Sequence, residues 1–125
     1  MLKFQAEFYE EGKHNPVEEF INKLPKKVKE KILKFICLLE EKGPKMPYLY
    51  CKKLTHQDFW ELKIDYGTNA YRIFFFYNDR TIVLLHGILK KTNSTPIEDL
   101  NLSGKRMKEW LKGNVKSYMK NRGNK

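Results

Sequence analysis

The chain has 125 residues, of which 41% are hydrophobic and 14% aromatic, so it can form one small domain with a closed core. Its 25 Lys and Arg against 15 Asp and Glu give a net charge of +10, which favours a polyanionic partner, with nucleic acid before an anionic membrane. No apolar run approaches the roughly 20 residues of a membrane-spanning helix. The opening MLKFQ lacks a secretory signal. A cytoplasmic protein with no membrane partner is therefore expected.

The first third of the sequence predicts one strand and two helices. Residues 2–9 alternate apolar and polar side chains with the period of a half-buried strand. Asn15-Pro16 is a helix-start signal, because Asn is a good cap and Pro suits the first helical position. A second amphipathic stretch runs from Val28 to Leu39 and ends at Gly43-Pro44. Two short consecutive helices are expected to form an antiparallel hairpin.

Three more strands and a final helix are predicted downstream. Residues 59–65 alternate, residues 70–77 are apolar on both faces like a central strand, and residues 80–89 follow. Gly67-Thr68 and Asn78-Asp79 are the predicted two-residue turns. A helix follows Thr95-Pro96, with an apolar stripe at Leu100, Met107, Leu111, Val115 and Tyr118. The predicted fold is α+β, in the order β-α-α-β-β-β-α, with an antiparallel sheet packed on the helical hairpin.

The positive charge is concentrated at the C-terminal end. Residues 105–125 hold eight basic residues and one acid, whereas the rest holds 17 basic and 14 acidic residues. The single domain, 1–125, is thus expected to carry a basic segment that is partly frayed from about residue 113. This segment is either a solvated face or a contact for phosphates or an acidic partner.

The predicted turns set the pairing of the strands. They place Lys63 directly opposite Arg72, Glu61 opposite Phe74, and Arg72 opposite Leu85. Alternation then gives a charged face, expected to form a groove, with Glu61, Lys63, Arg72, Leu85, Leu89 and Lys91. It gives an apolar face, expected to lie under the helical hairpin, with Trp60, Leu62, Ile64, Tyr71, Ile73, Phe75, Leu84, His86 and Ile88. On this face His86 is expected to be a buried structural residue.

Lys63 opposite Arg72 is an unfavourable cross-strand pair, because like charges destabilise facing positions. Either Glu61 and Asp65 neutralise the pair in a solvated charge ladder, or the pair holds an anion such as a phosphate. Further cations flank it at Lys52, Lys53, Lys90 and Lys91, and the Phe74 ring offers a surface for stacking a base.

Three segments in this order resemble the RelE/ParE toxin superfamily, and most of all its HigB-like, phage-associated branch. They are WELKI at 60–64, YRIFFF at 71–76 and LLHGILKKTNSTP at 84–96. The resemblance covers about residues 8–110 and agrees with the predicted order of elements. It implies a RelE-like fold and the toxin of a type II toxin–antitoxin system.

The resemblance also implies an activity and partners. Such toxins are ribosome-dependent mRNA endonucleases that need no metal or other cofactor. They drive attack of the RNA 2′-hydroxyl on the adjacent phosphate, which leaves a 2′,3′-cyclic phosphate and a free 5′-hydroxyl. The implied partners are the ribosome, mRNA and a cognate helix-turn-helix antitoxin. In agreement, the two cysteines, Cys37 and Cys51, stand in no metal-binding pattern and are expected to be reduced thiols.

The basic positions of the family match Lys63, Arg72 and either Lys90 or Lys91. In the implied mechanism Arg72 and Lys91 stabilise the phosphorane, and Lys63 clamps the phosphate or protonates the leaving oxygen. Glu61 either accepts the 2′-hydroxyl proton or orients the cations. The expected RNA-binding residues are Lys52, Lys53, Lys90 and Phe74. The sequence departs from close relatives at Lys63, where they have Arg, which binds phosphate through two donors.

Two other functions stay open at this point. ParE-type members of the same superfamily inhibit gyrase with the same fold, and fold alone does not determine function. The other alternative is a non-catalytic RNA-binding protein whose basic residues only contact phosphates.

Overall fold

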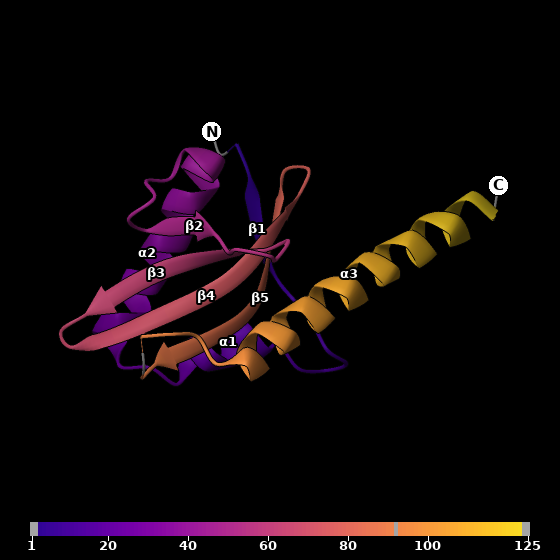
Figure 1. The fold of residues 1–125 in the computed structure, drawn as a ribbon. Coiled ribbons are helices and arrows are strands. Elements are labelled where there is room, and N and C mark those ends of the chain that lie inside the picture. Colours follow the sequence, from indigo (N-terminus) through magenta and orange to yellow (C-terminus); the bar gives the residue numbers. More distant parts are fainter. Residues whose placement is uncertain (1–2, 92, 124–125) are drawn as a thin grey trace.

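A computed structural model describes residues 3–91 and 93–123, with side chains up to residue 113. It is an α+β fold, as predicted, with three α-helices and one five-stranded sheet (Figure 1). The elements follow in the order β1 (Gln5–Phe8), α1 (Pro16–Asn22), α2 (Lys26–Lys42), the short 3-10 helix η1 (Gly43–Lys45), β2 (Cys51–Lys53), β3 (Trp60–Tyr66), β4 (Asn69–Asn78), β5 (Thr81–Lys90) and α3 (Ile97–Gly123). The three-residue strand β2 was not predicted, since it is too short to show a period.

The sheet is mixed, so the prediction of an antiparallel sheet is wrong for one edge. The strand order is β1-β5-β4-β3-β2, and β1 runs parallel to β5, whereas the other neighbours are antiparallel. Parallel pairing requires a long connection between the two strands. The chain provides one, because both hairpin helices and three strands lie between β1 and β5.

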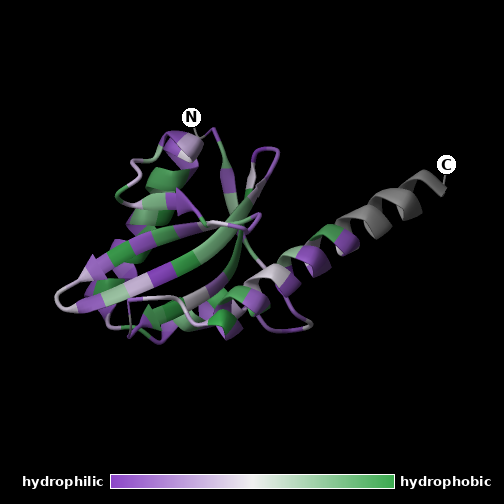
Figure 2. Cartoon of the chain, in the orientation of Figure 1, coloured by the Kyte–Doolittle hydropathy of each residue, from purple (hydrophilic) through white to green (hydrophobic). Residues whose placement is uncertain are grey.

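The helical hairpin covers one face of the sheet, as predicted (Figure 1). Helices α1 and α2 bury their apolar sides there, at Val17, Ile21, Val28, Ile32, Ile36 and Leu39. The strands meet them with Leu62, Ile64, Tyr71, Ile73, Phe75 and Leu84. Figure 2 shows the corresponding pattern, with hydrophobic and hydrophilic residues alternating along β3. Alternation of this kind gives β3 a buried side and leaves its other side for polar residues.

Helix α3 lies across the opposite face of the sheet and builds a second core. Its Met107, Leu100 and Trp110 pack on strand residues that include Phe59, Phe74, Phe76, Val83 and Leu85. This face was predicted to be a charged groove. The structure divides it instead, because α3 covers an apolar part and leaves the charged positions beside it.

The pairing of β3 with β4 is confirmed, with Lys63 opposite Arg72 and Glu61 opposite Phe74. The pairing of β4 with β5 was predicted wrongly for two reasons. The turn is Asp79-Arg80 rather than Asn78-Asp79, and Asp79 adopts a positive φ of 54°. In addition, an irregularity between Phe74 and Phe75 shifts the register of the remaining pairs. One extra residue moves every later side chain to the other face.

The shift changes the expected faces of the last strand. Arg72 lies opposite Ile88 instead of Leu85, and His86 lies opposite Phe74. His86 and Ile88 therefore belong to the α3 face, and Leu89, which pairs with Tyr71, belongs to the hairpin face.

Other predictions meet the structure only in part. Asn15 makes no side-chain cap, and its backbone N–H donates to Glu19 Oε2 at 2.9 Å. The side chains of Val115 and Tyr118 lie outside the described part of the chain. The single domain over 1–125, the fraying from about residue 113 and the RelE order of elements stay predictions. Among the described residues, no helix has the length and apolar character needed to cross a membrane.

Candidate functional site

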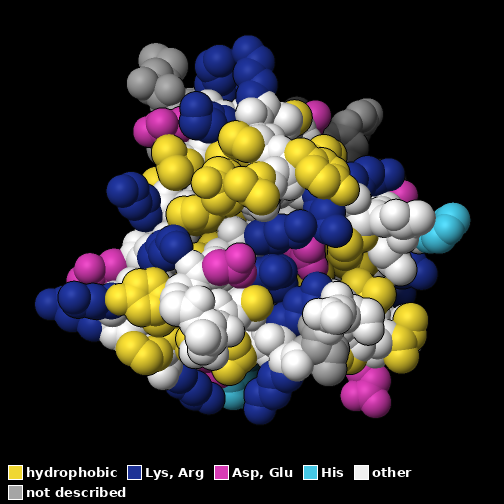
Figure 3. All heavy atoms as spheres, turned by 60° about the vertical axis from the view of Figure 1, so that its left-hand side comes forward, with side chains coloured by type: hydrophobic (Ala, Val, Ile, Leu, Met, Phe, Trp, Pro, Cys, Tyr) yellow, Lys and Arg dark blue, Asp and Glu magenta, His cyan; other side chains and the backbone are white. Residues whose placement is uncertain are grey.

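Four cationic residues come from four neighbouring strands onto the α3 face, beside the part that α3 covers. Strand pairing aligns Lys52 with Glu61, Lys63 with Arg72, and Lys90 with Ala70. Because side chains alternate between the two faces of a sheet, these residues all lie on the same face. We call Lys52, Lys63, Arg72 and Lys90 the cation cluster. Figure 3 shows Lys and Arg side chains gathered together with acidic ones in the middle of the view, next to hydrophobic side chains.

The charges of the cluster act on one another at Lys63. Burial lowers the pKa of the Lys63 amino group, and the nearby charges of Lys52, Arg72 and Lys90 lower that pKa further, whereas Glu61 raises it. A positive group that repels its neighbours in this way is stabilised when an anion binds between them. The arrangement therefore has the electrostatics of a phosphate-binding surface.

Arg72 is fixed by carboxylates and is not free to move toward a ligand. Its Nη1 donates to Asp65 Oδ1 at 3.0 Å and to the Tyr71 carbonyl at 2.9 Å, and its Nε lies 4.0 Å from Glu61 Oε1. The residue is 9% exposed, and its Nε has no hydrogen-bond partner. Of the two predicted alternatives, a charge ladder or an anion site, Arg72 fits the first, because it forms an ion pair with Asp65. The lysines are therefore the more accessible cations.

Glu61 is buried, whereas the lysines of the cation cluster are partly exposed. It is only 2% exposed, it is paired across the strands with Lys52, and its carboxylate is near the Arg72 guanidinium. A group that is closed off from solvent is poorly placed to accept a proton from an RNA hydroxyl. The geometry favours the second predicted role for Glu61, which is to orient the cations.

Three predicted RNA-binding or catalytic residues are not brought into the cluster. Lys53 pairs with Trp60 and so has the opposite strand parity from Lys52, on the hairpin side. Lys91 is exposed beyond the end of β5, and the charges that lower the Lys63 pKa include Lys90 but not Lys91. Phe74 has no exposed surface and packs against Phe59 and His86, so its ring is closed to a nucleobase.

Tyr48 joins the site and was not predicted from the sequence. Its ring centroid lies 5.9 Å from Lys63 Nζ, a cation–π contact, and the residue is 74% exposed. The only available signal was the aromatic character of Pro47-Tyr48-Leu49-Tyr50, a segment with no regular period. Its position next to Lys63 depends on the unpredicted strand β2.

His86 is part of the α3 packing. Its Nε2 is 2.7 Å from Asp99 Oδ1, and Arg106 Nη1 is 3.3 Å from its Nδ1. Burial lowers the His86 pKa, and Arg106 lowers it further, against the effect of Asp99. The face predicted for His86 is wrong, but these contacts fit its predicted structural role.

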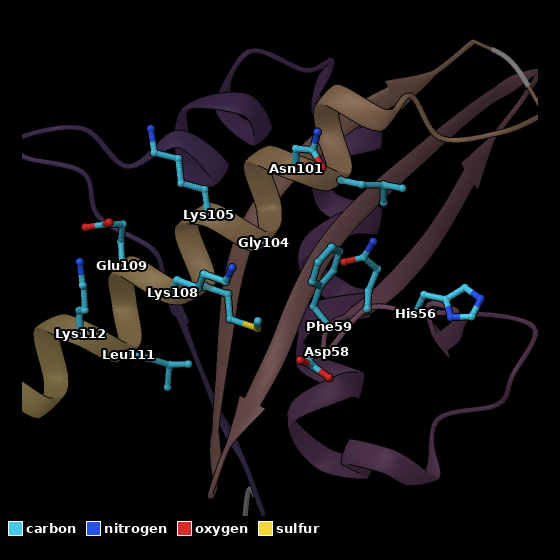
Figure 4. Close-up of a pocket in the computed structure, with 13 residues that line it drawn as sticks. His56, Asp58, Phe59, Asn101, Gly104, Lys105, Lys108, Glu109, Leu111 and Lys112 are labelled. Carbon is cyan, nitrogen blue, oxygen red and sulfur yellow. The ribbon is translucent and has the colours of Figure 1, made fainter.

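Two hollows flank α3, and neither includes a residue of the cation cluster. The first, of about 990 Å³, lies between α3 and the loop before β3 (Figure 4). Figure 4 shows Lys108 and Leu111 on the side of α3 toward Phe59, while Lys105 and Glu109 point away from it. The second, of about 1110 Å³, is bordered by acidic residues such as Glu7, Glu11 and Glu18. The three lysines of the cation cluster are half-buried beside α3, and Arg72 is buried.

The described residues offer no group of three or more His, Cys, Asp or Glu side chains able to hold a metal ion. Cys37 is exposed, whereas Cys51 is buried, and burial together with the Glu61 charge raises the Cys51 pKa to about 12. A thiol with so high a pKa is a poor nucleophile near neutral pH.

A search of curated proteins finds no match to the chain. A family profile described as "Phage derived protein Gp49-like (DUF891)" matches residues 19–108, which includes all four residues of the cation cluster. This match is consistent with a toxin of a toxin–antitoxin system. The chain belongs to the phage-derived Gp49-like family.

Proposed function

We propose that this protein is the toxin of a type II toxin–antitoxin system and acts as a ribosome-dependent endonuclease on mRNA. The observation that carries the proposal is the convergence of the half-buried Lys52, Lys63 and Lys90 around one ion-paired arginine. Membership of the Gp49-like family agrees with a toxin. A cognate helix-turn-helix antitoxin in the cytoplasm is the proposed partner, and covering the cation cluster would neutralise the toxin.

The proposed reaction is an internal transesterification of RNA. The 2′-oxygen bonds to the adjacent phosphorus while the bond from phosphorus to the 5′-oxygen breaks, so the products are a 2′,3′-cyclic phosphate and a 5′-hydroxyl. The 2′-hydroxyl loses one proton and the 5′-oxygen gains one, so the reaction is balanced without a cofactor. Charge accumulates on the phosphorane oxygens, and this is where cations act most strongly.

The residues of the cluster take different roles in this proposal. Lys63 contacts the phosphate, and Lys52 and Lys90 add positive potential on either side of it. Arg72 is a positioning residue, because Asp65 and Glu61 hold its guanidinium below the phosphate site. Lys91 and Lys53 have no part in the chemistry. Loss of one stabilising cation is expected to slow cleavage by about 10²–10³-fold.

The test is cleavage of a translated mRNA in a reconstituted translation reaction with purified protein, followed by primer extension. The expected result is cuts within codons that require ribosomes and carry 5′-hydroxyl ends. Lys63→Ala should remove most of the cutting. Lys53→Ala and Lys91→Ala are the matched controls, because each removes a neighbouring lysine outside the cluster.

The same reaction separates the alternative functions. Intact mRNA together with trapped gyrase–DNA complexes would support a gyrase inhibitor. Salt-sensitive RNA binding without cleavage would support a non-catalytic RNA-binding protein. Equal loss of cutting in Lys63→Ala and Lys53→Ala would remove the argument from the cation cluster.

A further inference from the structure

Exposed hydrophobic residues gather in one short segment before β2. Tyr48, Leu49 and Tyr50 are 74%, 69% and 40% exposed, and they are consecutive in the chain. Single exposed apolar residues are ordinary, but a contiguous group often marks a binding surface. This group adjoins the cation cluster through the contact of the Tyr48 ring with Lys63.

The segment is fastened at both ends, so Tyr48 has a defined place. The Pro47 carbonyl accepts hydrogen bonds from the N–H groups of Tyr50 and Cys51, at 2.9 and 3.0 Å, which close a turn around Tyr48. The Tyr50 carbonyl accepts from the Lys63 N–H at 2.7 Å, and this ties the turn to β3. The Tyr50 ring also packs edge-on against Phe35, 5.4 Å away.

These contacts leave Tyr48 as the more exposed of the two tyrosines of the turn, at 74% against 40% for Tyr50. The Tyr48 ring has a lysine on one side and is otherwise open, which is the combination that binds single-stranded nucleic acid: a cation for the phosphate and an aromatic ring for the base. The predicted stacking residue, Phe74, has no exposed surface to serve this purpose.

We propose that Tyr48 is a stacking platform for a nucleobase of single-stranded RNA whose adjoining phosphate binds Lys63. The proposal rests on the proposed nuclease function for the identity of its ligand, and it adds a base-binding subsite to the phosphate site. RNA is preferred to a protein partner because the Tyr48 ring adjoins the cation cluster, whose more accessible charges are those of lysines. Stacking on an aromatic side chain tolerates any base, so the subsite gives affinity and position rather than strict sequence choice.

The test uses a 2′-O-methyl RNA octamer, which cannot undergo cleavage, and a matched octamer in which every base is absent. Binding is measured by fluorescence anisotropy with full-length protein. Wild-type protein should prefer the octamer with bases. Tyr48→Ala should weaken binding of that octamer by about 5- to 150-fold, the range of one lost base stack, and leave the octamer without bases unaffected. Tyr48→Phe should bind like wild type.

Tyr66→Ala is the matched control. Tyr66 is also exposed, at 39%, and its ring also lies 5.9 Å from a lysine Nζ, that of Lys31, but it belongs to the hairpin side of the sheet. Its loss should leave RNA binding unchanged. Equal weakening by both tyrosine variants would overturn the proposal, as would an unchanged affinity in Tyr48→Ala. Failure of the wild-type protein to bind either octamer would overturn it too and would direct attention to a protein partner for Tyr48.

Cleavage of translated mRNA separates the two proposals. Base-dependent binding through Tyr48 without any mRNA cleavage would leave the subsite standing and remove the nuclease function. Cleavage of mRNA, together with octamer binding that is unchanged in Tyr48→Ala, would support the nuclease function and remove the base-binding subsite.

Discussion

Lys63 and Arg72 face each other across β3 and β4, yet only the arginine is neutralised within the protein. Arg72 donates to Asp65 at 3.0 Å and lies near the buried Glu61, whereas Lys63 contacts only the ring of Tyr48 among its described side-chain contacts. The like-charged pair is therefore stable because one member has its own carboxylates. The other member keeps its charge for an external anion, at the cost of a lowered pKa.

Arg72→Met is expected to lower the free energy of unfolding by about 3 kcal/mol, because it leaves the 2%-exposed Glu61 without its arginine. Asp65→Asn removes the more exposed partner of the same guanidinium and should lower it by less than about 1 kcal/mol. Urea denaturation measures both. Adding Glu61→Gln to Arg72→Met should recover part of the loss. A loss as large in Asp65→Asn, or no recovery in the double variant, would contradict this account of the pair.

Lys63→Arg is expected to keep RNA binding at neutral pH and extend it to more alkaline pH. The lowered pKa means that Lys63 loses its proton, and with it the attraction for phosphate, at a lower pH than an ordinary lysine with a pKa of about 10.5. Arginine stays charged throughout this range. Affinity for the octamer, measured as pH rises, should therefore fall earlier in wild type than in Lys63→Arg. Lys53→Arg, on the other side of β2, should titrate like wild type, and coincident curves for all three proteins would contradict the prediction.

The sequence predicted the elements with long apolar periods and the β3–β4 pairing, because Gly67-Thr68 leaves little freedom in that turn. It did not predict the position of the β4–β5 turn, and the irregularity near Phe75 has no sequence mark, so the faces of His86, Ile88 and Leu89 came out wrong. Of the site, Lys63 and the proximity of Arg72 were predictable. The neutralised state of Arg72 and the place of Tyr48 were not, because both depend on contacts between distant segments.

Gly87→Ala is expected to destabilise the protein by about 1–3 kcal/mol, the usual range for overpacking. A Cβ at Gly87 would lie 2.5 Å from the Phe20 ring of α1 and 3.1 Å from Ile73, so α1 can approach β5 only over a glycine. Gly113→Ala is the control, since a Cβ there meets nothing within 4 Å and α3 should gain up to about 1 kcal/mol. The free energies of unfolding of the two variants, measured by urea denaturation, should change in opposite directions. An unchanged free energy of unfolding in Gly87→Ala would show that Phe20 of α1 does not pack closely over Gly87.

The contacts of His86 predict an acid-sensitive attachment of α3. Neutral His86 can donate from Nε2 to Asp99 while its Nδ1 accepts from Arg106, and Glu11 lies 3.9 Å from the same guanidinium.

Because burial lowers the folded-state pKa of His86 below the ordinary value of 6.5, the unfolded chain binds the proton more readily. The stability that His86 contributes is thus complete above pH 6.5 and is lost as pH falls from there toward the lowered pKa, by at most about 1.4 kcal/mol per pH unit. His86→Gln, which does not titrate at this position, should flatten the dependence of the unfolding free energy on pH in this window. Identical slopes in wild type and His86→Gln would show that this histidine does not link α3 packing to protonation.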